Sequence, residues 1–298
     1  MNIGIIGAGS VGLLIASLLH DSHKVTVFTK RNEQKHQLNH NGIHMHEEKS
    51  IYISSIHAKT IADLTKQDLY IICVKQPQLE KLLCHEVWHT VHSYTPILCV
   101  QNGMSHIEQL QSRERPTYIG VFEHGVRRTS DYEIEYNGKG LLRVSRLSGD
   151  EAEYQRMMKE IDNDRFPIEL EHDMMEMLLQ KLAVNAIINS LTTLFMVPNG
   201  QIIENPNIKR MALMLTEEIA TVLGFEQPAL WNKVNRIAWQ TKTNESSMLQ
   251  DYKNGNETEI ESILGYVLKY NNQSKPYTMF LYEAIKARIK EREFKNET

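Results

Sequence analysis

The chain has 298 residues, with 33 Lys and Arg against 37 Asp and Glu, so its formal net charge is −4. A mildly acidic chain lacks the clustered positive charge of nonspecific nucleic-acid binders, and its purely apolar runs fall far short of the ~20 residues that cross a membrane. Three cysteines without a CxxC pair, and an N-terminus without a signal-peptide pattern, lead us to expect a reduced, cytoplasmic protein of about two domains.

Short apolar strands alternate with helical patterns through the first half of the chain. The apolar run 13–19 predicts a helix, and His44 and His46 are expected on one face of a solvated strand. Buried strands are predicted at residues 3–6, 25–28, 69–74, 97–100 and 118–122. Uninterrupted apolar strands separated by helices indicate a parallel sheet covered on both faces, so we expect an α/β domain.

Helical spacing replaces the strand pattern after about residue 165. Helices are predicted at 172–195, 208–223, 228–241, 260–268 and 276–290. The charged tail from Lys286 onward is expected to fray into solvent. The sequence therefore predicts an all-helical second domain, with the division at 1–167 and 168–298.

A glycine-rich turn follows the first predicted strand. Gly7, Gly9 and Gly12 form a GxGxxG pattern between that strand and the first predicted helix, which is the context that dinucleotide binding requires. Gly7 would permit the tight turn, Gly9 would let the backbone approach a pyrophosphate, and Gly12 would let helix and strand pack closely. A glycine turn in an α/β domain that binds no ligand is the alternative interpretation.

The end of the second predicted strand bears on the choice of dinucleotide. NAD sites usually carry Asp or Glu there, whereas this chain has Lys30 and Arg31. No carboxylate stands at that strand end to repel a 2′-phosphate, and a guanidinium binds a phosphate with two parallel hydrogen bonds. The pattern favours NADP(H), unless the two cations are ordinary surface charges.

A row of polar side chains follows the apolar helix predicted at 172–195. Lys181, Asn185 and Asn189 are four residues apart, so they lie on one stripe of that helix. A lysine and two amides on an otherwise buried helix are costly unless the stripe lines a polar site. Burial would also suit the lysine to proton transfer, although a purely structural network between helices accounts for the same spacing.

Two local patterns have ordinary structural interpretations. Residues 85–89 read HEVWH, the zincin signature, but they lie between two predicted buried strands, so we assign them to a crossover helix and expect no metal. Thr258 and Glu261 form a capping-box pattern, which predicts a helix start with Glu259 in its first turn.

Together with further segments, these residues form a pattern that resembles the ketopantoate reductases (2-dehydropantoate 2-reductases). The matching segments, in chain order, are GAGSVG at 7–12, VKQPQ from Val74, QNGMS from Gln101, HGVRR from His124, KLAVNAIINSLT from Lys181, VPNGQ from Val197, SSMLQD from Ser246 and TEIE from Thr258. The resemblance implies a Rossmann-type NADP-binding domain and a helical C-terminal domain similar to that of 6-phosphogluconate dehydrogenase. It also implies NADPH-dependent reduction of 2-dehydropantoate to (R)-pantoate, a step of pantothenate and coenzyme A biosynthesis.

The resemblance further implies roles for individual residues. Lys181 matches the family's catalytic lysine, which protonates the ketone oxygen, and Glu259 matches an acidic residue at the cofactor and substrate end of the site. The residues that match cofactor contacts are Gly7, Ala8, Gly9, Ser10, Val11, Gly12, Arg31, Lys75, Asn102, Val126 and Glu259. Those that match substrate contacts are Lys181, Asn185, Asn189, Asn199 and Ser247.

Departures from the usual family pattern keep two alternatives open. They occur at Ser105, Asn137, Ser190 and Glu261. The alternatives are reduction of another branched 2-oxo acid, and an NADP(H)-sensing module without catalysis. The expected partners are a small-molecule 2-oxo acid and a second copy in a homodimer, with neither nucleic acid nor a membrane.

Overall fold

The structure is a computed structural model that describes residues 1–84, 94–102, 104, 106–111 and 115–297. The chain forms two compact units. The N-terminal unit is built from Met1–Asn102 and His106–Met177, and the C-terminal unit mainly from Leu178–Thr298. The HEVWH segment at 85–89 lies outside the described residues.

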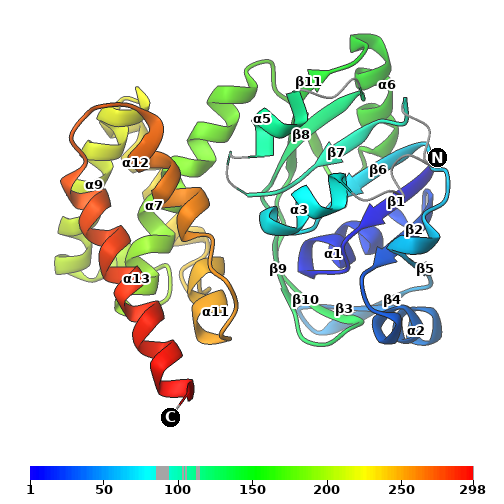
Figure 1. Cartoon of the computed structure of the whole chain (residues 1–298), viewed down its shortest axis with the longest axis horizontal. Coiled ribbons are helices and arrows are strands. Elements are labelled where there is room, and N and C mark those ends of the chain that lie inside the picture. Colours follow the sequence, from blue (N-terminus) through cyan, green and yellow to red (C-terminus); the bar gives the residue numbers. More distant parts are fainter. Residues whose placement is uncertain (85–93, 103, 105, 112–114, 298) are drawn as a thin grey trace. The chain divides into compact units, whose positions relative to one another are not determined.

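An eight-stranded sheet, counted in the described part of the chain, forms the middle of the N-terminal unit (Figure 1). Its strand order is β12-β11-β8-β7-β6-β1-β2-β5. The bounds are β1 Asn2–Ile6, β2 Lys24–Thr29, β5 His57–Thr60, β6 Leu69–Ile72, β7 Ile97–Cys99, β8 Thr117–Phe122, β11 Leu142–Ser148 and β12 Ile168–Leu170. The strands from β5 to β8 pair in parallel, and β11 is antiparallel to β8. The five predicted buried strands are thus β1, β2, β6, β7 and β8.

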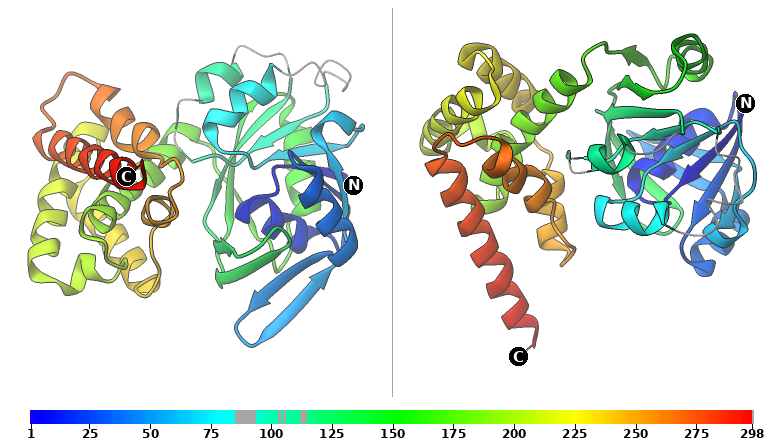
Figure 2. Two further views of the ribbon diagram at one scale, coloured as in Figure 1. Left: turned by 60° about the horizontal axis from the view of Figure 1, so that its bottom comes forward. Right: turned by 45° about the horizontal axis from the view of Figure 1, so that its top comes forward.

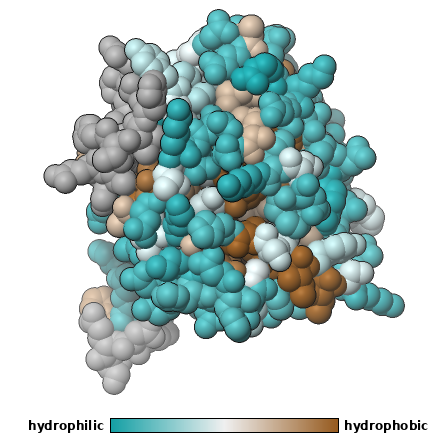
Figure 3. Space-filling model, turned by 90° about the vertical axis from the view of Figure 1, so that its right-hand side faces the viewer, coloured by the Kyte–Doolittle hydropathy of each residue, from teal (hydrophilic) through white to brown (hydrophobic). Residues whose placement is uncertain are grey.

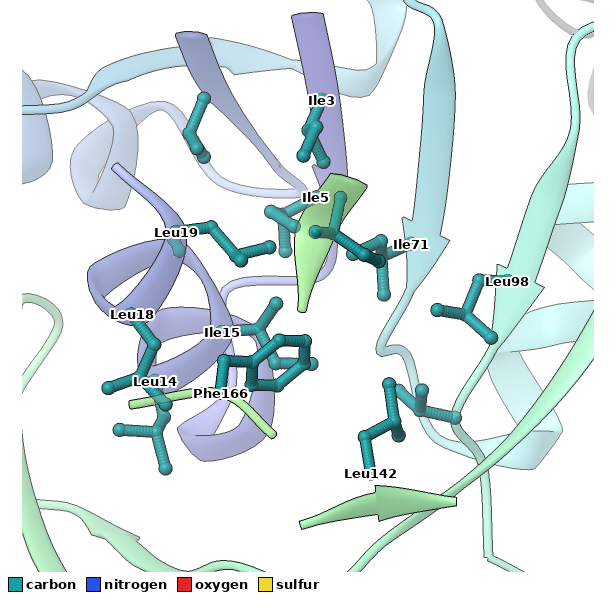
Figure 4. Close-up of a cluster of buried hydrophobic side chains, with 14 of the residues drawn as sticks. Ile3, Ile5, Leu14, Ile15, Leu18, Leu19, Ile71, Leu98, Leu142 and Phe166 are labelled. Carbon is teal, nitrogen blue, oxygen red and sulfur yellow. The ribbon is translucent and has the colours of Figure 1, made fainter. Parts of the chain in front are cut away.

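The five predicted strands of this sheet are largely apolar because both faces of the sheet are buried there. The helices of this unit are α1 Ser10–Leu19, α2 Asn32–Asn41, α3 Gln76–Leu83, α5 His106–Gln111 and α6 Glu151–Ile161. Side chains of α1, such as Leu14 and Ile15, meet Ile5 of β1 and Phe166 in one hydrophobic cluster (Figure 4). Alternate strand residues such as Ile6 point to the opposite face and are also buried. Burial of both faces removes the in–out alternation of a half-exposed sheet.

A four-stranded sheet, again counted in the described residues, packs beside α1. Its order is β4-β3-β10-β9, with bounds β3 Ile43–Glu47, β4 Ser50–Ser54, β9 Gly125–Arg128 and β10 Glu133–Gly138. The hairpin β3–β4 extends from the unit in Figure 2, and β4 exposes Ile51 and Ile53. The face drawn in Figure 3 is mostly hydrophilic, with small hydrophobic areas. The predicted histidine strand is β3, but the sequence did not predict the sheet around it, because its partner β10 lies some 90 residues away in the chain.

The first unit extends further along the chain than the predicted division at residue 167. Residues Ile168–Leu170 form β12, which pairs in parallel with β11 through Leu142 and Val144. The N-terminal unit accordingly reaches Met177, three residues into α7. The pairing of β12 with β11 places residues 168–170 in the first unit. A three-residue segment carries no local sequence pattern that would predict this pairing.

Helices and turns make up the described residues 178–297 of the C-terminal unit (Figure 1). Their bounds are α7 Met174–Phe195, α8 Gln201–Glu204, α9 Pro206–Leu223, α10 Gln227–Gln240, α11 Ser247–Lys253, the π-helix η2 Glu261–Gly265, α12 Tyr266–Tyr270 and α13 Pro276–Glu297. Among the described helices, α7 alone is long and apolar enough to cross a membrane, and 72% of its most apolar window is buried in the structure. We therefore interpret α7 as a core helix.

Two local predictions are wrong: the capping box of Thr258 and Glu261, and the frayed tail from Lys286 onward. The N-cap of η2 is Ile260, without a side-chain capping bond. The Glu261 carboxylate instead accepts hydrogen bonds from Tyr282 Oη (2.7 Å) and Lys286 Nζ (2.9 Å), so it does not complete a capping box with Thr258. These bonds stabilise α13, whose tail was expected to fray.

The end of α13 is anchored to two other helices. Arg288 donates to the Leu194 carbonyl of α7 (2.6 Å), and Arg292 donates to the Tyr252 carbonyl of α11. Both guanidinium groups also lie over the Tyr252 ring, 5.5 and 5.0 Å from its centroid. These contacts hold α13 against its own unit as far as Arg292, and the helix ends at Glu297.

The start of α13 is held by a buried carboxylate. Glu218 of α9 is only 9% exposed. It accepts hydrogen bonds from the backbone N–H groups of Tyr277 (2.9 Å) and Thr278 (2.7 Å), and from Thr278 Oγ1 (2.6 Å). The carboxylate thereby caps the first turn of α13, where the helix dipole favours a negative charge.

We expect Glu218→Ala to lower the free energy of unfolding by about 2–3 kcal/mol, because charge-assisted hydrogen bonds are lost and buried N–H groups are left unpaired. Urea unfolding followed by circular dichroism measures the change. Glu217→Ala is the matched control, since Glu217 is the exposed neighbour on the same helix. Equal effects of the two substitutions would contradict the capping role.

Candidate functional site

The glycine loop lies between β1 and α1, and its three glycines are required for different reasons. Gly7 has φ +106°, and a Cβ there would lie 2.9 Å from the backbone nitrogen of Val74. A Cβ at Gly12 would collide with the Gly7 carbonyl oxygen. At Gly9, by contrast, no heavy atom of the described residues beyond its neighbours in the chain lies within 4 Å of an added Cβ. Gly7 and Gly12 serve the fold, whereas Gly9 borders open space.

The first turn of α1 presents backbone donors beside that open space. Gly9 is the N-cap of α1 and makes no side-chain capping bond, and Ser10 and Val11 are partly exposed. The loop carbonyl of Ala8 accepts hydrogen bonds from Gln34 Nε2 (2.8 Å) and Arg128 Nη1 (3.1 Å). A helix N-terminus that presents backbone N–H groups fits the pyrophosphate of a dinucleotide.

Arg31 lies two residues after the end of β2, at the N-cap of α2. Its side chain is 49% exposed, and its guanidinium forms an ion pair with Asp131, which is 27% exposed. Asp131 belongs to the turn between β9 and β10. The structure therefore brings Arg31 and the glycine loop to the same end of the sheet, and adds a carboxylate that the local sequence did not indicate.

Lys75 and Asn102 follow neighbouring parallel strands, β6 and β7. Lys75 is exposed and Asn102 is partly exposed. The buried side chain of Gln101 donates to the carbonyls of Ile72 (2.9 Å) and Val74 (3.2 Å), which fixes the segments after both strands. Ligands of open α/β sheets bind outside the carboxyl ends of the strands, where these residues and the glycine loop lie.

Val126 is partly exposed on β9, and the segment before it is ordered by a buried histidine. His124 stacks on Phe122 and Phe166, with ring centroids 4.9 and 5.9 Å away. Its Nδ1 lies 2.8 Å from Tyr136 Oη. Burial lowers the pKa of His124 to about 4, so the ring is neutral at pH 7. Sequence reasoning missed this residue, since its aromatic partners come from distant segments.

The polar row predicted on α7 is present in the C-terminal unit. Lys181 and Asn185 are partly exposed, and Asn189 is 5% exposed. Their neighbours Ala183 and Ile187 are fully buried. The row is thus the polar stripe of a helix whose other sides are buried.

Asn199 is hydrogen-bonded to the end of α10, and Ser246, the residue before Ser247, is hydrogen-bonded to α7. Buried Asn199 follows α7 and donates through Nδ2 to Thr241 Oγ1 (2.9 Å). Thr192 Oγ1, on α7 itself, lies 2.8 Å from Ser246 Oγ. Ser246 is the N-cap of α11, so the exposed Ser247 becomes its first residue. The bond between Thr192 and Ser246 holds the start of α11 next to the end of α7.

Glu259 lies in the turn that immediately precedes η2. It is partly exposed, and its carbonyl accepts a hydrogen bond from the Ile263 N–H (3.0 Å). The candidate residues therefore form two sets, with the dinucleotide set on the N-terminal unit and the substrate set, with Glu259, on the C-terminal unit. Within the described residues, no group of three or more His, Cys, Asp or Glu could hold a metal ion.

Comparison with known proteins identifies the family. The profile described as ketopantoate reductase PanE/ApbA matches residues 3–149, and the profile of its C-terminal part matches residues 173–289. The chain belongs to the ketopantoate reductase family. Both the resemblance stated from the sequence and the predicted fold class, a Rossmann-type α/β unit followed by a helical unit, are confirmed.

Individual members of the family match over nearly their whole length. The 2-dehydropantoate 2-reductase of Bacillus subtilis (strain 168) is 35% identical, covering 96% of this chain and 97% of the relative. That of Listeria innocua is also 35% identical, with 96% of each chain covered. The solved structure of PanE from Bacillus subtilis is 36% identical, has a TM-score of 0.83 and covers 96% of this chain and 99% of the other.

Two of the loop glycines, Gly12 and Gly9, should respond differently to alanine. Gly12→Ala should lower the free energy of unfolding by roughly 2–3 kcal/mol, because the backbone has to move to admit the methyl group. Gly9→Ala should leave it within about 1 kcal/mol, since the backbone at residue 9 is extended and the space is open. Urea unfolding of both variants is the measurement. A large loss in Gly9→Ala would contradict the open space.

Acid should weaken the fold through His124. Its ordinary pKa of 6.5 is lowered to about 4, so the unfolded chain binds a proton that the folded chain excludes. The stabilisation is fully present above pH 6.5 and is lost as the pH falls toward 4. The urea midpoint should therefore fall more between pH 7 and 4.5 in the wild type than in His124→Gln. The exposed His57→Gln is the control, and a wild-type slope in both variants would refute the assignment.

Proposed function

We propose that the chain is a 2-dehydropantoate 2-reductase that reduces 2-dehydropantoate to (R)-pantoate with NADPH, in pantothenate and coenzyme A biosynthesis in the cytoplasm. The observation that carries the proposal is the full-length likeness to curated 2-dehydropantoate 2-reductases at 35% identity. A match across both units includes the glycine loop and the polar row of α7 in one chain. The proposed partners are a small 2-oxo acid and, in a homodimer, a second copy.

Cofactor binding is proposed for the N-terminal unit. The open space at Gly9 and the backbone donors of Ser10 and Val11 suit a pyrophosphate, and Arg31 suits the 2′-phosphate of NADPH. Lys75, Asn102 and Val126 complete this proposed set, with Glu259 from the C-terminal unit. When bound, NADPH supplies the hydride that is added to the carbonyl carbon.

Lys181 is proposed as the general acid. Its ammonium group would donate a proton to the ketone oxygen as the hydride reaches the carbonyl carbon, so that the ketone becomes a secondary alcohol. The neutral lysine would then regain a proton from water. A cation next to the oxygen also stabilises the negative charge that develops there. The partly exposed position of Lys181 on a mostly buried helix supports this role.

Asn185, Asn189, Asn199 and Ser247 are proposed to hold the 2-oxo acid. Amide and hydroxyl groups can donate hydrogen bonds to a carboxylate and orient it without adding charge. The bond between Thr192 and Ser246 (2.8 Å) supports a common placement, because it holds the start of α11 beside α7. Groups fixed before the substrate arrives lose little entropy on binding it.

The test is oxidation of NADPH, followed by its absorbance, with a panel of 2-oxo acids. We expect turnover with 2-dehydropantoate, and Lys181→Met should lower kcat by about 10²–10⁴-fold while NADPH still binds. The exposed Lys209→Met is the charge-matched control and should retain full activity.

Each result of this test leads to a different conclusion. Turnover that survives in Lys181→Met would refute the proposed acid. Oxidation with another branched 2-oxo acid, but not with 2-dehydropantoate, would replace the substrate. Binding of NADPH without oxidation by any member of the panel would favour a sensing module.

A further inference from the structure

A carboxylate reaches the proposed 2′-phosphate site from a distant part of the chain. The end of β2, where NAD sites usually carry Asp or Glu, has Lys30 and Arg31. Asp131, 100 residues further along, pairs with the Arg31 guanidinium. The sequence around β2 therefore gives an incomplete account of the charge at this position.

The turn that carries Asp131 is fixed by its own hydrogen bonds. The Thr129 N–H donates to the Glu133 carbonyl (3.0 Å), which closes the turn between β9 and β10. Ser130 Oγ accepts hydrogen bonds from the backbone N–H groups of Tyr132 (3.3 Å) and Glu133 (3.0 Å). The position of Asp131 is thus set by the sheet and not by its bond to Arg31 alone.

The same turn is connected to the glycine loop through one buried side chain. Gln34, 5% exposed, donates from Nε2 to the Asp131 carbonyl (3.0 Å) and to the Ala8 carbonyl (2.8 Å). Arg128, at the end of β9, donates to the Ala8 carbonyl as well (3.1 Å). These bonds hold the Asp131 segment, Arg31 and the cofactor loop in one arrangement within the N-terminal unit.

We propose that Asp131 is a specificity-determining residue of the dinucleotide site, which accepts the ribose 2′-hydroxyl of NADH and opposes the 2′-phosphate of NADPH. The proposal rests on the proposed function of Arg31. A carboxylate beside Arg31 repels a phosphate bound by the same guanidinium, whereas it is the usual acceptor for the 2′-hydroxyl of NAD. The chain should then prefer NADPH less strongly than Arg31 alone would make it.

The ion pair itself is weak enough to yield to the phosphate. Both side chains are partly exposed, and such pairs contribute little to stability and are screened by salt. A guanidinium has five N–H donors, so Arg31 can bind a phosphate while one N–H still faces Asp131. Asp131 therefore lowers the affinity for a 2′-phosphate without abolishing it.

The experiment measures equilibrium binding of NADP⁺ and NAD⁺ by calorimetry, without any 2-oxo acid. Asp131→Asn should tighten NADP⁺ binding by about 3- to 10-fold at low salt and weaken NAD⁺ binding by about 3-fold, with the first effect shrinking at high salt. Glu135→Gln is the matched control. It removes a carboxylate of similar exposure, paired with Arg127 at 2.7 Å, from the adjoining strand β10, and should leave both dissociation constants unchanged.

The outcomes separate this inference from the proposed function. Weaker or unchanged NADP⁺ binding in Asp131→Asn would overturn the inference, since Asp131 would then only position Arg31 or have no influence. Absence of NADP⁺ binding in the wild type would overturn the proposed function along with it. A third outcome overturns only the inference. In it, the wild type binds NADP⁺ more tightly than NAD⁺, Arg31→Ala loses this preference for NADP⁺, and Asp131→Asn does not increase it.

Discussion

The close approach of backbone to backbone at the glycine loop is the constraint on which the N-terminal unit depends. Gly7 packs against the Val74 nitrogen just beyond β6, and Gly12 packs against Gly7 itself. A side chain at either position would push α1 away from the sheet. This contact brings the start of α1 to the carboxyl ends of β1 and β6. The candidate cofactor residues Lys75 and Arg31 lie at the same edge, because β6 and β2 both run parallel to β1.

In the C-terminal unit, polar groups lie on and next to a core helix and need hydrogen-bond partners. Asn189 is nearly buried on α7, and the neighbouring turns are polar too. Hydrogen bonds such as Thr192 to Ser246 and Asn199 to Thr241 offset the cost of removing these groups from water. The bond between Thr192 and Ser246 also fixes where α11 begins, because Ser246 is the N-cap of that helix. The same hydrogen bond therefore serves both burial and positioning.

Local patterns predicted most of the fold, because apolar strands and helical spacing are properties of neighbouring residues. The β1–α1–β2 order, the position of α7 and the placement of the glycine loop all follow from such patterns. Predictions failed or were absent where partners lie far apart in the chain. Strand β12 needs β11, Glu261 is engaged by Tyr282 and Lys286, and Arg31 meets Asp131. No window of neighbouring residues contains these pairs.

The open space at Gly9 distinguishes two reasons for glycine in one short motif, which are packing of the fold and access of a ligand. Gly7 and Gly12 stabilise the fold through close backbone contacts, whether or not the chain binds anything. A Cβ at Gly9 would meet no described atom beyond its neighbours in the chain, so only a ligand gives a reason to exclude a side chain there. A descendant that had given up dinucleotide binding would be expected to retain the first and last glycines and to drift at the middle one. Retention of Gly7 and Gly12 thus indicates the fold, and retention of Gly9 indicates ligand binding.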